Sequence, residues 1–448
     1  TLLRSKISGV SMKENKLLSP AAIFLLGVNS IIGSGIFLLS GKIYEDAGIW
    51  SLLAILCAGL SIFVIAFAYA NMSKIYSKNG GAFVYAKETF GRFPGFIVGM
   101  VTWLLGTVTL ATEVSALLTA MKMILPNLNS RLIGIIIILA LGIISYFGSS
   151  IIAGLDNLTS VVKIVLVLVF IFTCLWLVRG LNFSSPNLLT ASSANLGGFK
   201  GFLSAYGTVF FFFTGFSFLP VNAEKMKNPA KNLPKMMSLV MLTCLAVYMI
   251  IQTITIGALG PELTKTLVPA ATAFSKIVGS IGIPLFVVGI CFSIFGVIVA
   301  TTFNTPTILA SLAQAHEDVP MFVSKNNRFG TPTWAIILTT VCGIALFLSG
   351  NYVFLSGLTV FMSFVQYLST GLANIKKKFL LIGIGSVLFS LVLLTSFTLS
   401  VLILGLGILI LLVLIYFVVK LDDDEREKWL KEHQEKSKGA DVNTVKRL

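Results

Sequence analysis

The sequence predicts an all-α integral membrane protein, and three observations lead to this fold class. Of the 448 residues, 56% are hydrophobic and only 11% are charged, whereas a soluble protein carries roughly a quarter charged residues. The apolar residues form continuous runs, and a membrane helix takes about 20 such residues. Because these runs do not alternate between apolar and polar positions, they predict helices rather than a membrane β-barrel.

Twelve apolar runs are predicted to cross the membrane as helices, because lipid offers backbone amides no other partners. Their ranges are 20–39, 49–73, 93–123, 131–148, 155–179, 200–222, 235–259, 281–313, 333–349, 352–372, 378–395 and 397–419. The membrane domain therefore covers residues 18–420, between an N-terminal tail (1–17) and a C-terminal tail (421–448). Met12 is a candidate for the natural start, which would make residues 1–11 extraneous.

The formal net charge of +15 follows the expected membrane topology and does not indicate nucleic-acid binding. If the N-terminus is cytoplasmic, the inside segments carry 25 Lys and Arg residues and the outside segments carry 7. This asymmetry is the positive-inside pattern, and it predicts a cell-membrane protein with both termini in the cytoplasm. No basic stripe is interleaved with stacking aromatic residues, so a nucleic-acid partner is not expected.

No metal or cofactor is predicted. All five cysteines lie within apolar runs, and their odd number fits neither a disulfide framework nor a zinc site. The two histidines, His316 and His433, lie near polar segments. The sequence has no nucleophile–base pair and no phosphate loop, which disfavours a membrane-embedded enzyme. It has no filter motif or charged ring, which disfavours a channel.

Two of the predicted spans are interrupted by glycine at mid-depth. The first contains the stretch GSG (33–35), and the sixth contains Gly215 within FFFFTGFSFLP. One interrupted helix in each half of a membrane protein is the best sequence pointer to a transporter binding site. The two breaks lie five spans apart, which is an odd number, so the second half is expected to be inverted. The repeats cover about 20–179 and 200–372, and two further helices lie within 378–419.

A helix break of this kind suits a zwitterion. Glycine lowers the cost of leaving helical geometry, and the freed N–H groups of Ser34, Gly35 and Ile36 favour an anion. Freed carbonyl groups favour a cation, so an α-amino acid matches the break. The alternative is that the glycines only permit close helix packing. The matching break in the sixth span favours the binding site.

Four segments, taken in order, resemble those of the amino acid–polyamine–organocation (APC) transporter superfamily. They are GSGIFLL (33–39), GGAFVYAKETFG (80–91), TGFSFLPVNAEKMKNPAKNLPK (214–235) and NRFGTPTWA (327–335). Their order and spacing cover about residues 18–420. The resemblance implies the LeuT-type fold, a 5+5 inverted repeat in which helices 1 and 6 are unwound at mid-membrane. It also implies alternating access around a site at the midplane.

Two positions depart from the family pattern. Ser217 stands where the family usually has an acidic residue, and Ala310-Ser311-Leu312 stands where it usually has a Ser-Arg pair. The gate-linked acidic contact of the family is therefore not carried over to this chain, and no substrate is inferred from it.

The resemblance implies a substrate site built from both breaks. The expected substrate-binding residues are Ile31, Gly33, Ser34, Gly35, Ile36, Phe211, Phe213, Thr214, Gly215 and Ser217. Phe211 is expected to line or gate the pocket, with Thr214 beside it. At least one side chain of the run Phe210–Phe213 is expected to pack against lipid instead.

Lys163 lies about eight residues into the fifth span, roughly 12 Å from its start. A charge at that depth is costly and usually functional. The resemblance places it where sodium symporters hold a sodium ion, so that its ammonium group bridges spans 1 and 8. Burial disfavours the charged amine, so Lys163 could release and regain a proton during transport. The alternative is a lysine that extends to the cytoplasmic surface.

Glu113, in the third span, is the second candidate coupling residue. It is expected to pair with a cationic substrate group, relay protons or hydrogen-bond a neighbouring helix; alternatively, it faces the outer vestibule. Thr301 and Thr302 form an alternative sodium site. Hydroxyls in membrane helices usually bond their own backbone, however, and Lys163 makes sodium the less expected ion.

These observations predict a secondary active transporter of amino acids. Neutral side chains are favoured, because the pocket residues that can be named are small, apolar or hydroxylic. Proton-coupled symport and amino acid exchange both stay open. Two alternatives are an amino acid/amine antiporter that uses Glu113 and a sodium-coupled symporter that uses Thr301 and Thr302. The expected partners are an amino acid, the lipid bilayer and, in symport, protons; no oligomeric state is predicted.

Overall fold

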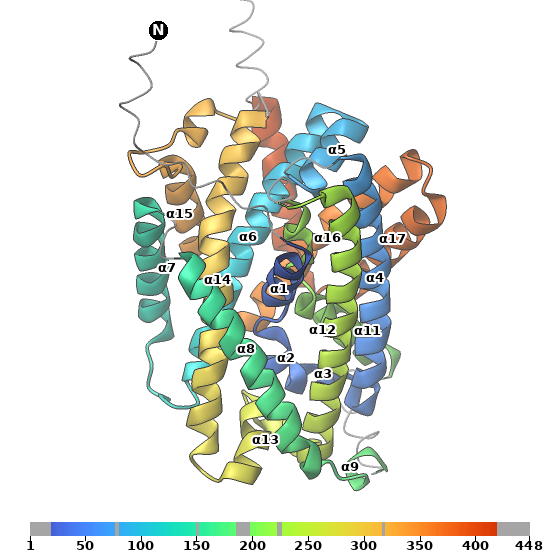
Figure 1. The fold of residues 1–448 in the computed structure, drawn as a ribbon, viewed down its shortest axis with the longest axis vertical. Helices are drawn as coiled ribbons and strands as arrows, with labels where there is room; N and C mark the ends of the chain where they lie inside the picture. Colours follow the sequence, from blue (N-terminus) through green and yellow to red (C-terminus); the bar gives the residue numbers. More distant parts are fainter. Residues whose placement is uncertain are drawn as a thin grey trace, which may run out of the picture.

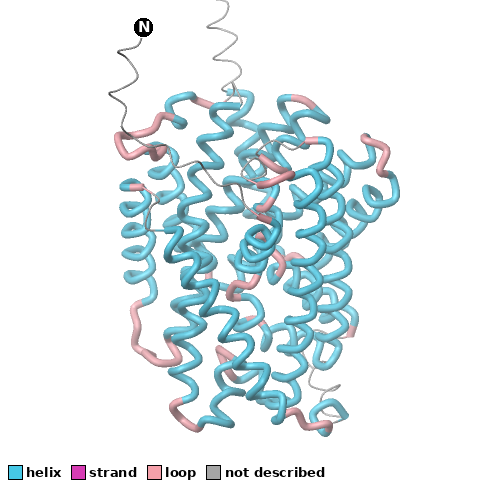
Figure 2. Tube along the Cα trace, in the orientation of Figure 1, coloured by secondary structure: helices cyan, strands magenta, loops and turns pink. Residues whose placement is uncertain are grey.

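The computed structural model describes residues 19–76, 80–148, 152–184, 198–221, 226–315 and 319–418. Within these ranges the regular elements are helices, and the one β contact is an isolated bridge between Asn326 and Pro332. Figures 1 and 2 show long helices packed side by side along the long axis of the molecule. The all-helical prediction is therefore confirmed. Both predicted tails and both histidines lie outside the described residues.

The helices differ widely in length. In chain order they are α1 (Pro20–Ile31), α2 (Gly35–Leu38), α3 (Ser40–Ala47), α4 (Ser51–Ile75), α5 (Ala82–Phe90), α6 (Arg92–Met121), α7 (Ser130–Phe147), α8 (Ile152–Cys174), α9 (Leu181–Ser184), α11 (Phe199–Phe212), α12 (Pro229–Leu259), α13 (Pro269–Val278), α14 (Gly282–Ala315), α15 (Thr333–Ser349), α16 (Tyr352–Lys376) and α17 (Leu380–Leu393). A further helix covers Leu399–Val418.

In the described part of the chain, nine helices are long and apolar enough to cross a membrane. Three shorter apolar helices accompany them: Val161–Leu177, Thr333–Ser349 and Leu380–Ser396. Each predicted span overlaps one of these segments. The short helices α5 and α13, of 9 and 10 residues, lie outside the predicted spans.

The first predicted span is broken where its glycines lie. α1 begins after Ser19, whose hydroxyl accepts the N–H of Ala22 at 3.3 Å, and it ends at Ile31. Helical geometry resumes at Gly35 in the four-residue α2, and α3 follows. A Cβ atom on Gly35 would lie 2.7 Å from Cδ1 of Phe212. A side chain at Gly35 would therefore push α2 away from Phe212, the last residue of α11.

The sixth predicted span is broken in the same region of the molecule. α11 ends at Phe212, and the short 3-10 helix η3 (Phe216–Phe218) follows. Between them Gly215 has a φ angle of 111°, in the left-handed region that favours glycine. A Cβ atom on Gly215 would collide with the carbonyl oxygen of Ser30. Glycine is therefore required both for the turn and for the contact between the two breaks.

α6 and α14 pack along each other and carry one wall of the central region. A Cβ atom on Gly106 of α6 would collide with the hydroxyl group of Thr305 on α14. Gly99 faces Leu312 in the same way. Small residues at such positions let membrane helices approach closely.

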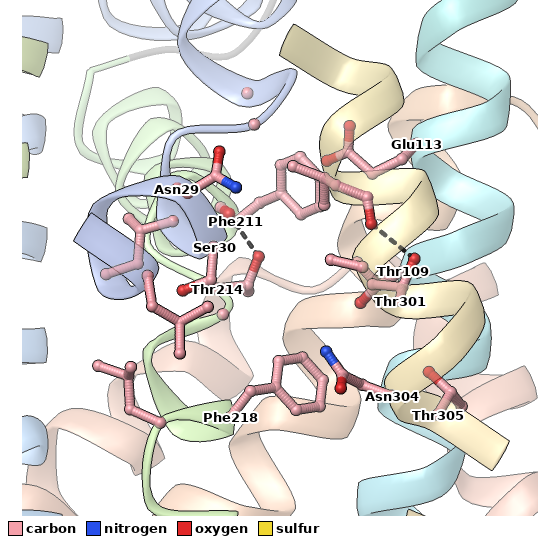
Figure 3. Close-up of a pocket in the computed structure, with 18 residues that line it drawn as sticks. Asn29, Ser30, Thr109, Glu113, Phe211, Thr214, Phe218, Thr301, Asn304 and Thr305 are labelled. Atoms are coloured by element: carbon pink, nitrogen blue, oxygen red, sulfur yellow. Dashed lines mark hydrogen bonds between the residues drawn. The ribbon is translucent and has the colours of Figure 1, made fainter. Parts of the chain in front are cut away.

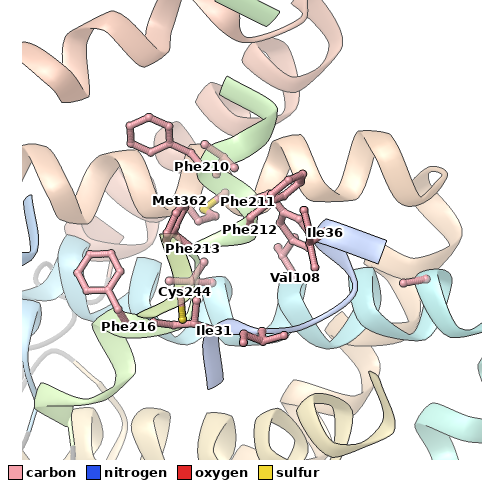
Figure 4. Close-up of a cluster of buried hydrophobic side chains, with 14 of the residues drawn as sticks. Ile31, Ile36, Val108, Phe210, Phe211, Phe212, Phe213, Phe216, Cys244 and Met362 are labelled. Carbon is pink, nitrogen blue, oxygen red and sulfur yellow. The ribbon is translucent and has the colours of Figure 1, made fainter. Parts of the chain in front are cut away.

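The phenylalanine run Phe210–Phe213 lies inside the helix bundle (Figure 4). All four side chains are buried, so the expectation that at least one of them packs against lipid is wrong. The reason is that aromatic rings pack against the run, from Tyr248 of α12, from Tyr352 of α16 and from Tyr206 of α11 itself. A run of four aromatic residues cannot lie on one helix face, but α11 has neighbours on several sides.

Candidate functional site

A cavity lies where the two helix breaks face α6 and α14 (Figure 3). It holds about 820 Å³ of empty space, including open solvent at its mouth. In Figure 3, the side chains of α1 and η3 lie opposite those of α14. The cavity thus lies between two interrupted helices and two continuous ones.

Most of the predicted substrate-binding residues line this cavity. They are Ile31, Gly33, Gly35, Phe211, Thr214 and Gly215, and Glu113 and Thr301 join them. Four predicted residues do not line it: Ser34, Ile36, Phe213 and Ser217. Each of these four is buried behind the cavity wall. Lys163 and Thr302 are also buried outside the lining.

The side chain of Glu113 reaches the first helix break. The hydroxyl of Ser34 donates a hydrogen bond to Oε1 of Glu113 at 3.0 Å. A Cβ atom on Gly33 would lie 2.8 Å from the same Oε1 atom. In the GSG stretch, Ser34 therefore supplies a hydroxyl donor and Gly33 leaves room for the carboxyl group.

Tyr352, at the start of α16, completes this contact. Its hydroxyl donates to Oγ of Ser34 at 2.8 Å, so the hydroxyl hydrogen of Ser34 is directed to Glu113. The ring of Tyr352 packs edge-on against Phe211, with the centroids 6.0 Å apart. A hydrogen-bonded chain thus runs from Tyr352 through Ser34 to Glu113, and Phe211 packs against the Tyr352 end of it.

Tyr248 of α12 joins the two breaks. Its hydroxyl lies 2.7 Å from the carbonyl oxygen of Phe212 and 3.2 Å from that of Ile31. These are the last residues of α11 and α1, whose final carbonyls have no partner within their own helices. One hydroxyl group therefore serves both interrupted helices. Sequence reasoning missed Tyr248, because nothing local marks a tyrosine in an apolar span as a partner of distant carbonyls.

Lys163 is buried, with 1% of its side chain exposed. Its ammonium nitrogen donates to the carbonyl oxygen of Asn29 on α1 at 2.8 Å, so the side chain does not extend to the surface. α8, which carries Lys163, packs against α14, where Gly296 lies in contact with Thr159. The lysine therefore links α8 to α1 just before the first break.

The two threonines of the alternative sodium site direct their hydroxyl hydrogens into their own helix. Thr301 donates to the carbonyl oxygen of Val297 at 2.8 Å (Figure 3), and Thr302 donates to that of Ile298 at 2.8 Å. This is the usual behaviour of hydroxyls in membrane helices. Thr301 still faces the cavity.

Several polar lining residues were not predicted. They are Asn29, Ser30, Thr109, Asn304 and Thr305. A signal for three of them was present, because Thr109 is four residues from Glu113, and Asn304 and Thr305 are three and four residues from Thr301. Residues at these spacings share one face of a helix. The apolar lining residues, such as Leu26 and Phe218, had no comparable signal.

Among the lining residues, Glu113 is the one with an ionisable side chain. The mouth of the cavity lies near Asn304, which is exposed, and near Ser30 and Phe218, which are partly exposed. Phe211, on the other side of the cavity, is buried. Asn304 lies in the later part of α14, which runs in Figure 1 toward the end of the molecule that carries α5. The cavity therefore opens toward that end.

Comparison with known proteins identifies what the chain is similar to. Residues 18–422 match the amino acid permease family. The chain is 28% identical over 356 residues to a serine/threonine exchanger of Bacillus subtilis, covering 76% of this chain and 78% of the relative. It is 27% identical over 383 residues to an uncharacterized transporter of Mycobacterium tuberculosis, covering 79% and 78%. It is 23% identical over 376 residues to a histidine permease of Lactococcus lactis, covering 80% and 78%.

Proposed function

The chain belongs to the amino acid permease family, and from this premise we propose that it is a secondary active transporter of amino acids with neutral side chains. It is a multi-pass membrane protein, as the family and the apolar helices imply. The proposed mechanism is alternating access around the cavity between the two breaks. The observation that carries the proposal is the convergence of both interrupted helices on one cavity, because half-helix ends and unwound carbonyls are what transporters use to bind small charged groups.

The composition of the cavity supports a neutral substrate side chain. Its lining is apolar or uncharged except for Glu113, so a second charge on the substrate would find at most one charged partner. The relatives do not narrow the choice further, because one is named for serine and threonine and another for histidine. We therefore assign the class of substrate and not the individual amino acid.

The proposed architecture has twelve spans, with residues 20–179 and 200–372 as inverted repeats. The positions of the two breaks support this arrangement. It is also supported by Tyr248, whose hydroxyl contacts the last carbonyl group of α1 and that of α11. The proposed orientation puts both termini and the α5 end in the cytoplasm. It is supported by basic residues near that end, which include Lys74, Lys325 and Lys376.

Lys163 and Glu113 are the proposed coupling residues. In proton symport, Lys163 would release a proton and with it the contact to the carbonyl group of Asn29. In exchange, Lys163 would stay charged and hold α8 to α1 throughout the cycle. The contact at 2.8 Å is compatible with both modes.

The test is uptake of labelled neutral amino acids into proteoliposomes of the purified protein. Vesicles are empty or preloaded with unlabelled amino acid, each with and without an inward proton gradient. Accumulation in empty vesicles only with the gradient indicates symport. Uptake only into preloaded vesicles indicates exchange. No uptake under any of the four conditions would contradict the proposal.

A second candidate function is the exchange of an amino acid for an amine. It is favoured by Oε2 of Glu113, which is buried and has no hydrogen-bond partner among the described residues. An ammonium group of a substrate would satisfy it. Transport of amines that survives the change Glu113→Gln would contradict this function. The sodium-coupled alternative has less support, because Thr301 and Thr302 bond their own helix.

A further inference from the structure

A carboxyl group of the protein itself occupies the first helix break. The hydroxyl of Ser34 donates to Oε1 of Glu113 at 3.0 Å. Ser34 lies within the GSG stretch, and Glu113 comes from α6, 79 residues further along the chain. Tyr352 and Gly33 add to the fit, because Tyr352 orients the Ser34 hydroxyl and Gly33 leaves room for Oε1.

The same place is the proposed seat for the carboxylate of the substrate. Gly33 and Gly35 line the cavity on either side of Ser34. No Lys, Arg or His is among the lining residues, so the cavity offers a substrate carboxylate no cationic side chain in place of the Ser34 hydroxyl. Two carboxyl groups cannot both use the hydroxyl hydrogen of Ser34, and two adjacent carboxylates repel each other.

We infer that Glu113 is a built-in substitute for the substrate carboxylate, and that an incoming amino acid has to displace it from Ser34. This inference rests on the proposed function. In this arrangement Glu113 weakens the binding of every ligand that carries a carboxylate, because each must first break the contact between Ser34 and Glu113. Glu113 is thus a specificity-determining residue that acts by competition.

An amine without a carboxylate does not compete with Glu113 for Ser34. Oε1 of Glu113 is held by Ser34, whereas Oε2 is buried, belongs to a residue that lines the cavity and has no partner among the described residues. An ammonium group can bind Oε2 while Oε1 stays on Ser34. Removal of the Glu113 carboxyl group should therefore strengthen the binding of amino acids and weaken the binding of the matching amines.

The experiment measures equilibrium binding to the purified full chain in detergent. The probes are L-alanine and L-serine, each paired with its decarboxylated counterpart, ethylamine or ethanolamine. The variants are Glu113→Ala and, as a matched control, Glu88→Ala, which removes an exposed carboxyl group on α5. Glu113→Ala is expected to bind the amino acids roughly tenfold more tightly, because the ligand no longer has to break the hydrogen bond between Ser34 and Glu113. The same variant is expected to bind the amines more weakly, and Glu88→Ala is expected to match the unaltered chain.

Two other results separate the inference from the proposed function. If the unaltered chain binds the amino acids but Glu113→Ala binds them equally or more weakly, the inference is overturned and the proposed function stands. If the unaltered chain binds neither amino acid, the proposed function fails for these substrates, and the inference fails with it.

A second measurement covers the case in which Glu113→Ala does not fold. Infrared difference spectra of the unaltered chain record the carboxyl stretching band before and after addition of L-serine or ethanolamine. The band of Glu113 is identified by its absence from the isosteric variant Glu113→Gln. L-Serine is expected to shift this band, because the carboxyl group leaves Ser34. An unchanged band upon saturation with L-serine would overturn the inference.

Discussion

The hydroxyl of Tyr248 lies 2.7 Å from the carbonyl oxygen of Phe212 and also reaches the carbonyl oxygen of Ile31 at 3.2 Å. Because it serves the ends of both interrupted helices, the change Tyr248→Phe should lower transport at least about tenfold. It should also lower the free energy of unfolding by about 1–3 kcal/mol, because two buried carbonyl groups lose their donor. Uptake into proteoliposomes and thermal unfolding in detergent measure the two effects.

The matched control for this prediction is Tyr146→Phe. Tyr146 is partly exposed at the end of α7, and its ring packs against Phe147 and Phe329. Removal of its hydroxyl group is expected to leave transport and stability unchanged. Equal effects of the two substitutions would contradict the role assigned to Tyr248.

Gly35→Val should abolish transport and leave the protein folded. A Cβ atom at this position would lie 2.7 Å from Cδ1 of Phe212 and 3.2 Å from its Cα atom, so the larger side chain separates the two breaks and crowds the cavity. Size-exclusion chromatography in detergent verifies folding, and labelled uptake reports transport. Gly407→Val is the control, because a Cβ atom on Gly407 meets no atom within 4 Å. Normal uptake by the Gly35 variant would remove the first break from the substrate site.

Lys163→Ala should remove the dependence of uptake on a proton gradient. The variant has no group that can release a proton beside the carbonyl oxygen of Asn29, which the ammonium nitrogen contacts at 2.8 Å. Uptake is measured with and without the gradient, and Lys122→Ala, which changes an exposed lysine, serves as the control. A gradient that still drives uptake in the Lys163 variant would show that the proton is carried elsewhere.

Lys325→Cys and Lys265→Cys should react with a membrane-impermeant maleimide from opposite sides of the membrane. Both lysines are exposed, and the proposed orientation puts Lys325 in the cytoplasm and Lys265 outside. In intact cells of a strain that makes a cysteine-free form of the chain, only the Lys265 variant is expected to react. Reaction of the Lys325 variant alone would reverse the orientation.

Much of the fold could be predicted from the sequence, because in lipid the backbone amides must find their hydrogen-bond partners within the protein. Each apolar run long enough to cross a bilayer had to become a helix, and every predicted span overlaps an apolar helix in the structure. The two breaks were accessible for a related reason. In a helix that lipid would otherwise keep regular, the GSG stretch and Gly215 lower the cost of a turn.

The hydrogen-bond partners of the residues at the two breaks could not be predicted in this way. The hydroxyl of Ser34 donates to Glu113, a partner that the sequence did not specify, and Tyr248 and Tyr352 were not singled out at all. Each of these contacts joins residues far apart in the sequence, and local patterns carry no information about which distant group a polar side chain meets. The lipid-facing packing expected in the run Phe210–Phe213 was wrong for the same reason, since the neighbours of α11 come from elsewhere in the chain.

The close packing of α6 against α14 has a consequence for how a ligand is recognised. Gly106 and Thr305 leave no space between the two helices for even a methyl group, and such interfaces do not slide freely. In the proposed alternating-access cycle, the groups that these helices present to the cavity, including Glu113 and Thr301, would therefore keep a constant spacing, whichever side of the membrane the cavity faces. Discrimination between ligands would then be the same during loading and release in this proposed cycle. A difference in affinity between the two events would arise on the opposite wall, where α1 carries Ser30 and η3 carries Phe218.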